Sequence, residues 1–205
     1  MPVFLDDVSF FYTPSIIPVV ASAIIWQLIF DRNSGVANAF VELFGGHAVS
    51  WLLDPTVFFA LIVMVLWGVG GGMVLSLAGL QSIPQELIEA ARVDGANVFQ
   101  SFFRITLPIL SPVLFFQAVT GTIYALQTLI QPLLLSQNKG IGHYAGTIQR
   151  SNYLYMVHVY EQFFANQRFG YGSALLWILF AIILAVTLLV FRSSTFWVYY
   201  EVDQE

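Results

Sequence analysis

The stretch 82–108, SIPQELIEAARVDGANVFQSFFRITLP, is a charged segment between two apolar ones. Its charged side chains are Glu86, Glu89, Arg92, Asp94 and Arg104. The flanking runs 55–85 and 105–138 carry no charge, and each exceeds the length of about 20 residues that crosses a bilayer. Because a charge at the bilayer centre costs about 2.5–3.5 kcal/mol, we expect segment 82–108 to lie in water at one face of a membrane.

This charged segment has the local pattern of a helix, a sharp turn and a second short helix. Ser82 followed by Gln85 predicts a capping box at the start of the first helix. Gly95 follows Asp94 and predicts a stop in the left-handed conformation. The second helix is predicted over 98–105, before Pro108 returns the chain to the membrane.

Composition places the chain among integral membrane proteins. Of its 205 residues, 58% are hydrophobic and only 9% are charged, against about 25% charged in soluble domains. The prediction is one all-α domain over residues 1–205. The net charge of −5, with seven Lys plus Arg, argues against a nucleic-acid partner. The absence of cysteine excludes a disulfide framework and a thiolate metal site.

Four membrane-spanning helices are expected. They cover about residues 10–30, 57–80, 112–135 and 173–191. Between the first two, Val36, Ala37, Phe40, Val41 and Phe44 have the spacing of a short amphipathic helix at the membrane interface, ended by Gly45-Gly46. The fourth helix ends near an aromatic group of Trp197, Tyr199 and Tyr200 that suits the interface.

Glycines are concentrated in the second span, at positions 68, 70, 71 and 72. Small residues let neighbouring helices approach closely, so helix packing is one interpretation. The other is a loosened helix beside a substrate path, with Gly68 and Gly71 as the candidates.

A polar stripe runs along the third span. It consists of Gln117, Thr120, Gly121, Tyr124, Gln127, Thr128 and Gln131, at steps of three and four. Phe115, Val119, Leu126 and Ile130 make the opposite face apolar. Since lipid offers no hydrogen bonds, the stripe either joins helices or lines a cavity. A sugar suits such a cavity, because its hydroxyls pair with amides and its C–H face stacks on Tyr124.

The segment 136–168 is expected to form a loop at the opposite end from 82–108. His158 and Glu161 lie three residues apart in it, but they lack the further ligands of a metal site and are interpreted as a solvated pair.

The residues Glu89-Ala90-Ala91, Gly95, Ile105 and Leu107-Pro108 resemble the EAA loop of ABC importer permeases at every fixed position. The flanking text LAGLQSIPQELIEAARVDGAN is similar to the sugar-importing subgroup. On periodicity and charge alone, the segment reads as an ordinary linker between membrane helices. The resemblance implies the core of a six-helix permease in the prokaryotic plasma (inner) membrane. It also implies that about two helices precede position 10 in the full protein.

The resemblance assigns coupling to a partner ATPase to nine residues. They are Glu86, Glu89, Ala90, Ala91, Asp94, Gly95, Ile105, Leu107 and Pro108. Glu89 would bond a basic or amide group of the ATPase, the two alanines would let the helix sit deep in a groove, and Gly95 would make the turn. It also implies a second related permease subunit, an external solute-binding protein and a sugar-like substrate. No catalytic residue is assigned to this chain.

The sequence contains no GxxxxGK[ST] motif, so we expect ATP and Mg²⁺ to be bound by a partner and no cofactor by this chain. A passive channel and a membrane scaffold remain as alternatives, and an intramembrane enzyme lacks acidic or basic groups within the spans. The resemblance places segment 82–108 in the cytoplasm. Charge bias does not support this, with Arg92, Arg104 and Arg192 inside against Arg32, Lys139, Arg150 and Arg168 outside.

Overall fold

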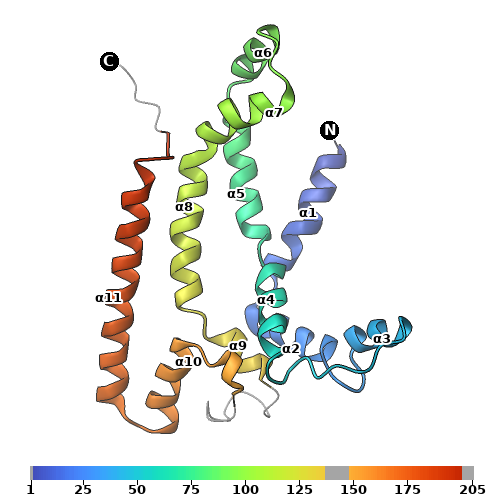
Figure 1. Cartoon of the computed structure of the whole chain (residues 1–205), viewed down its shortest axis with the longest axis vertical. Helices are drawn as coiled ribbons and strands as arrows, with labels where there is room; N and C mark the ends of the chain where they lie inside the picture. Colours follow the sequence, from blue (N-terminus) through green and yellow to red (C-terminus); the bar gives the residue numbers. More distant parts are fainter. Residues whose placement is uncertain (1, 137–147, 200–205) are drawn as a thin grey trace.

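The computed structural model describes residues 2–136 and 148–199, which form helices and connecting turns without a strand (Figure 1). The α-helices are α1 (Pro2–Ile16), α2 (Val19–Ile29), α3 (Val36–Leu43), α4 (Val57–Trp67), α5 (Gly70–Gln81), α6 (Gln85–Val93), α7 (Val98–Ser101), α8 (Leu107–Leu126), α9 (Ile130–Leu135), α10 (Tyr155–Tyr160) and α11 (Phe169–Ser194). The predicted all-α class is confirmed.

Among the described residues, three helical stretches are long and apolar enough to cross a membrane: Val57–Gln81, Val98–Leu126 and Phe169–Ser194. A fourth is added if the bent pair of α1 and α2 counts as one span. In Figure 1, α5, α8 and α11 run side by side, with α6 and α7 at one end and α9, α10 and α3 at the other.

The first predicted span, 10–30, is not one straight helix. The chain bends by 103° between Ile16 and Val19. Pro18 has extended backbone angles, φ −55° and ψ 138°. Proline cannot donate a backbone hydrogen bond, and it disfavours the helical conformation of the residue before it, which accounts for the break.

The second predicted span, 57–80, is interrupted once near its middle. The backbone N–H groups of Gly68 and Val69 donate to carbonyls three residues back, at 3.1 and 3.3 Å, before α5 begins. At the start of α5, Gly70 lies so close to α1 that an added Cβ would be 2.1 Å from the carbonyl oxygen of Phe11. The break therefore lies where α1 crosses.

The third predicted span is wrong at both ends. Its helix starts before position 112, since α7, a π-helical turn at Phe102–Thr106 and α8 form one stretch, Val98–Leu126. It also stops at Leu126, and the short α9 follows. Pro132 cannot donate to a carbonyl four residues back, so a continuous helix through this point would lose a hydrogen bond.

The buried core joins α2, α4 and α9. It is formed by Ala23, Phe30, Leu52, Ala60, Leu61, Met64, Leu134 and Leu135. The rings of Trp26 and Phe30 stack at 5.2 Å, and the ring of Trp51 lies 5.8 Å from that of Phe30. The side-chain amide of Gln27 donates to the carbonyl of Leu134, which fixes α9 against α2.

The predicted loop 136–168 is partly helical, and its part 137–147 lies outside the described residues. A 3-10 turn at Arg150–Asn152, α10 and a π-helical turn at Glu161–Ala165 precede α11. The carboxylate of Asp54 accepts the backbone N–H groups of Arg150 and Ser151, both at 2.9 Å. The hydroxyl of Tyr155 donates to the carbonyl of Leu175 at 2.8 Å, so this region is tied to both α4 and α11.

Candidate functional site

The elbow, defined as residues 82–108, projects beyond the ends of α5 and α8 (Figure 1). Its first helix, α6, ends in two nested backbone hydrogen bonds. The N–H of Gly95 donates to the carbonyl of Arg92 at 3.1 Å, and the N–H of Ala96 donates to that of Ala91 at 2.9 Å. This is a Schellman motif, and the φ of Gly95, +81°, lies in the left-handed region that the sequence predicts for it.

The capping box predicted at Ser82 and Gln85 is wrong. Ser82 ends α5 and its hydroxyl donates to the carbonyl of Gly79, while α6 starts after Pro84 without a side-chain cap. A capping box exists instead at the start of the next helix, α7, where Asn97 accepts from the N–H of Gln100 and the Gln100 side chain accepts from the N–H of Asn97. The spacing Asn-x-x-Gln was the signal, and it directly follows the predicted turn.

The coupling residues predicted in α6 divide between two faces. Glu86, Glu89, Ala90 and Asp94 are exposed. Ala91 is buried, so of the two alanines predicted to let the helix sit deep in a groove only Ala90 lies on the exposed surface of α6. The exposed surface of α6 therefore carries three carboxylates and Ala90 beside the apolar Leu87 and Val93.

The predicted coupling residues Ile105, Leu107 and Pro108 lie within a continuous helix and not at the end of a short one. The predicted helix 98–105 is corrected accordingly. The N–H of Leu107 donates to the carbonyl of Phe102, five residues back. A π-helical turn at this point accommodates Pro108, which cannot donate to Arg104 and would crowd its carbonyl in a regular α-helix.

The predicted polar stripe does not act as one surface. The amide of Gln117 donates to the carbonyl of Gly72 at 2.9 Å and to the hydroxyl of Ser76 at 3.0 Å, so it joins α8 to α5. The hydroxyls of Thr120 and Thr128 donate to carbonyls of their own helical turn. Gln131 is half-buried in α9, beyond the end of α8.

Gly121, Tyr124 and Gln127 remain exposed at the end of α8 that lies away from the elbow. The side chain of Tyr124 is 78% exposed. On the apolar face, Phe115 is buried and contacts Phe191 and Trp197 edge to face. The stripe thus reduces to a smaller exposed group of Gly121, Tyr124 and Gln127.

The glycines of α5, and Gly68 at the end of α4, serve different purposes. Gly70 is required by the crossing of α1, and an added Cβ at Gly79 would lie 2.7 Å from Leu110 of α8. An added Cβ at Gly71 would meet nothing within 4 Å, and one at Gly68 would only touch the carbonyl of Val65 at 3.6 Å. Of these four, Gly70 and Gly79 are packing residues and Gly71 is not.

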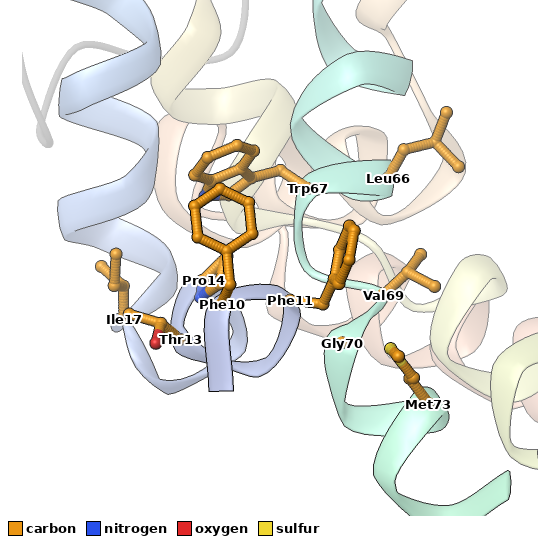
Figure 2. A pocket seen from close by; sticks show the side chains of 10 residues that line it. All are labelled: Phe10, Phe11, Thr13, Pro14, Ile17, Leu66, Trp67, Val69, Gly70 and Met73. Carbon is orange, nitrogen blue, oxygen red and sulfur yellow. The ribbon is translucent and has the colours of Figure 1, made fainter. Parts of the chain in front are cut away.

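A cavity of about 510 Å³ lies where the bend before α2 meets the interruption between α4 and α5 (Figure 2). Figure 2 shows that apolar side chains line it, among them Phe10, Phe11, Trp67 and Met73. The hydroxyl of Thr13, which also lines it, donates to the carbonyl of Ser9. None of the predicted path residues lines this cavity.

The sequence predicts that His158 and Glu161 form a solvated pair. In the structure both side chains also contact Tyr153. The hydroxyl of Tyr153 lies 2.9 Å from Nδ1 of His158 and donates to the carboxylate of Glu161. Burial, then the hydrogen bond and negative charge of Glu161, raise the pKa of Tyr153 to about 12. Within residues 2–136 and 148–199, no group of three His, Cys, Asp or Glu could hold a metal ion.

Long apolar helices with a charged elbow at one end define an integral membrane protein of the helical class. The chain belongs to the family of binding-protein-dependent transport system inner membrane components, whose model matches residues 7–204.

Curated relatives agree with this family, and a solved structure shares the fold. The chain is 41% identical to the probable ABC transporter permease protein YesP of Bacillus subtilis, over 95% of this chain and 62% of that protein. It is 30% identical to the arabinooligosaccharides transport system permease protein AraP of the same species, over 89% and 57%. It thus spans about three fifths of these relatives. The fold matches a chain in the crystal structure of a bacterial alginate ABC transporter with a TM-score of 0.81 at 23% identity, over 92% of this chain and 64% of that one.

Proposed function

We propose that this chain is a permease subunit of an ATP-driven importer that forms the path for a sugar or a related polyol. Its elbow, through Glu89–Pro108, receives the force of a separate ATPase. The family membership and the names of relatives that transport arabinooligosaccharides or trehalose and maltose support this proposal.

The observation that carries the proposal is the continuity between the elbow and the exposed group of α8. The stretch Val98–Leu126 is one helix of 29 residues, about 43 Å long. It begins directly after the turn at Gly95 and reaches Tyr124 near its other end. A displacement of the elbow therefore moves Gly121 and Tyr124 as part of the same rigid element.

In the elbow, each residue has a role that follows from its position. Glu89, exposed on the outer face of α6, bonds a basic or amide group of the ATPase, and Glu86 and Asp94 add negative charge beside it. Ala90 permits close approach of the partner surface. Ala91 is buried, so Ala90 is the alanine that can face a partner.

The energy of transport enters from outside this chain, because the sequence has no P-loop that would bind ATP and Mg²⁺. A cytoplasmic ATPase dimer would close on ATP and push the elbow, which shifts the permease between two states. A second related permease subunit completes the path, and an external solute-binding protein delivers the substrate. Family members depend on binding proteins, and the alginate transporter was solved with a periplasmic one.

On the substrate side, Tyr124 and Gln127 are the residues we assign to the path, with Gly121 and Gly71 providing room. Both side chains are exposed, and no helix packing depends on them in the way it does on Gln117. Tyr124→Ala and Gln127→Ala are expected to lower sugar uptake while ATPase assembly stays intact. Gln117→Ala, by contrast, is expected to weaken the contact between α5 and α8.

The test of the proposal is the variant Gly95→Pro in a transporter reconstituted with its ATPase and binding protein. Proline requires a φ near −65°, and Gly95 has +81°, so the turn cannot form. We expect substrate-stimulated ATP hydrolysis to be lost while the chain still inserts in the membrane.

The matched control is Gly45→Pro. Gly45 has a φ of +78° and ends α3 with the same motif, far from the elbow. Stimulated hydrolysis should survive in this variant. Equal, wild-type coupling in both variants would contradict the proposal and leave a passive channel or a scaffold as the better description.

A further inference from the structure

The short helix α3 has an apolar face that touches no other part of the described chain closely. Val36, Phe40, Leu43 and Phe44 recur at spacings of four, three and one and lie on one face, with 59–82% of each side chain exposed. Asn38 and Glu42, four residues apart, lie on the other side. The apolar side of α3 is thus turned outward and its polar side is turned toward the chain or water.

This orientation is fixed by hydrogen bonds. Asn38 is buried, and its amide donates to the carbonyls of Arg32 and Val49 at 3.0 and 2.9 Å. Its side-chain oxygen accepts the N–H of Val49 at 2.9 Å and the indole N–H of Trp51 at 2.8 Å. Every hydrogen-bonding group of the Asn38 side chain is engaged, so α3 cannot rotate to bury its phenylalanines without breaking four bonds.

The turn that leads into α3 is equally restricted. The carboxylate of Asp31 accepts the N–H groups of Asn33 and Ser34, both at 2.9 Å. An added Cβ at Gly35 would lie 2.3 Å from the carbonyl oxygen of Asp31. The direction in which α3 leaves α2 is therefore determined by packed backbone.

The position of α3 in the fold suits a membrane surface. In Figure 1 its axis runs across the direction of α5, α8 and α11, at the end of the molecule opposite the elbow. It is connected to α2 and α4, which themselves expose apolar side chains such as Ile24, Leu28 and Phe59. The apolar face of α3 continues this lipid-facing surface around the end of the spans.

We propose that α3 is an interfacial anchor, whose face of Val36, Phe40, Leu43 and Phe44 is buried in the lipid leaflet opposite the elbow. A protein partner is the weaker occupant, because a specific interface buries about 800 Å² from 20–30 residues on each side and this face has four side chains. A lipid surface needs only an amphipathic helix in the plane of the membrane. The anchor would hold the junction of α2 and α4 at a fixed depth.

Spin labelling tests this proposal directly, since the chain has no native cysteine. Phe40→Cys, Leu43→Cys and Glu42→Cys are each labelled in the full chain, reconstituted in phosphatidylcholine vesicles. Collisions with oxygen report lipid and collisions with a water-soluble nickel chelate report water. We expect oxygen to dominate at 40 and 43 and the chelate to dominate at 42, although all three lie within one turn of helix.

Leu184→Cys, on the exposed side of α11, reports correct insertion by high oxygen accessibility. With that control satisfied, chelate access at 40 and 43 would overturn the proposal. Low access of both reagents at these positions would also overturn it, because a protein partner or a second copy would then cover the face. In Asn38→Ala the difference between 40 and 42 should shrink, as α3 is free to rotate.

Discussion

The elbow helix α6 and the anchor helix α3 are built in the same way and present opposite chemistry. Each is short, and each ends in a glycine with φ near +80°, where an added Cβ would meet nothing within 4 Å. The exposed surface of α6 carries Glu86, Glu89 and Asp94 beside the apolar Leu87 and Val93, whereas the exposed face of α3 carries four apolar side chains and no charge. The backbone motif only positions such a helix, and the exposed side chains decide whether it meets a protein or a lipid.

Replacing one carboxylate on each helix by lysine gives the largest expected effect, and the quantity that should differ is the affinity for the ATPase. Glu89→Lys reverses a charge in the proposed ATPase interface, and disrupting a charge of this kind costs about 2–5 kcal/mol of binding. Since each 1.4 kcal/mol is a factor of ten, the affinity for the ATPase should fall by about 25-fold or more. Glu42→Lys, on the water side of α3, should leave binding unchanged. Affinity of the purified ATPase for proteoliposomes measures both, and equal losses would refute the contrast.

The two asparagines that organise these helices provide the next comparison. Asn38→Ala leaves two partly buried donors, the N–H of Val49 and the indole N–H of Trp51, and two carbonyls without their partner, and each unsatisfied buried group costs about 1–3 kcal/mol. Asn97→Ala removes an exposed cap, at about 1 kcal/mol. Denaturant unfolding in detergent, followed by tryptophan fluorescence, should show a larger decrease in the free energy of unfolding for Asn38→Ala than for Asn97→Ala. A larger loss for Asn97→Ala would mean that α3 is not locked as described.

The smallest expected effect is a pH-dependent loss of local stability at the end of the molecule that holds α3. Hydrogen bonds from Ser151 and from the backbone N–H of Arg150 hold the pKa of Asp54 below its ordinary value of 3.8. A carboxyl group with a lowered pKa stabilises the folded state above 3.8 and loses this contribution as pH falls through the folded pKa.

Amide hydrogen exchange, corrected for its intrinsic pH dependence, should therefore lose protection at Arg150 and Ser151 below pH 3.8. The N–H of Gln100 is bonded to the neutral side chain of Asn97 and should show no such loss. Asp54→Asn should remove the pH dependence at both loop amides. Persistence of that dependence in the variant would exclude Asp54 as its source.

The sequence was sufficient for features that depend on local pattern. Charge-free runs predicted the apolar helices, the spacing in 36–44 predicted α3, and Asp94-Gly95 predicted the left-handed turn. These follow from hydrophobicity, periodicity and glycine conformation, which act over a few residues.

Features that depend on distant contacts could not be predicted. The sequence of α5 alone does not show that a side chain is excluded at Gly70 and tolerated at Gly71. The two positions differ because the backbone of α1 at Phe11 lies against Gly70 and not against Gly71. Likewise, Gln117 looks like part of a stripe until Gly72 and Ser76 are placed beside it. The prolines at 18, 108 and 132 mark helix breaks and a π-helical turn, because proline has no N–H to donate to the carbonyl four residues back.

The sidedness of the two helices tests the central claim most directly. Val93→Cys places a thiol in the elbow at a side chain that is 88% exposed, and Glu42→Cys places one on the water side of α3. In intact cells with a permeable outer envelope, a membrane-impermeant maleimide should label Glu42→Cys alone, and it should label both variants after the plasma membrane is opened. Labelling of Val93→Cys from outside would contradict the account, because a cytoplasmic ATPase could not then reach the elbow.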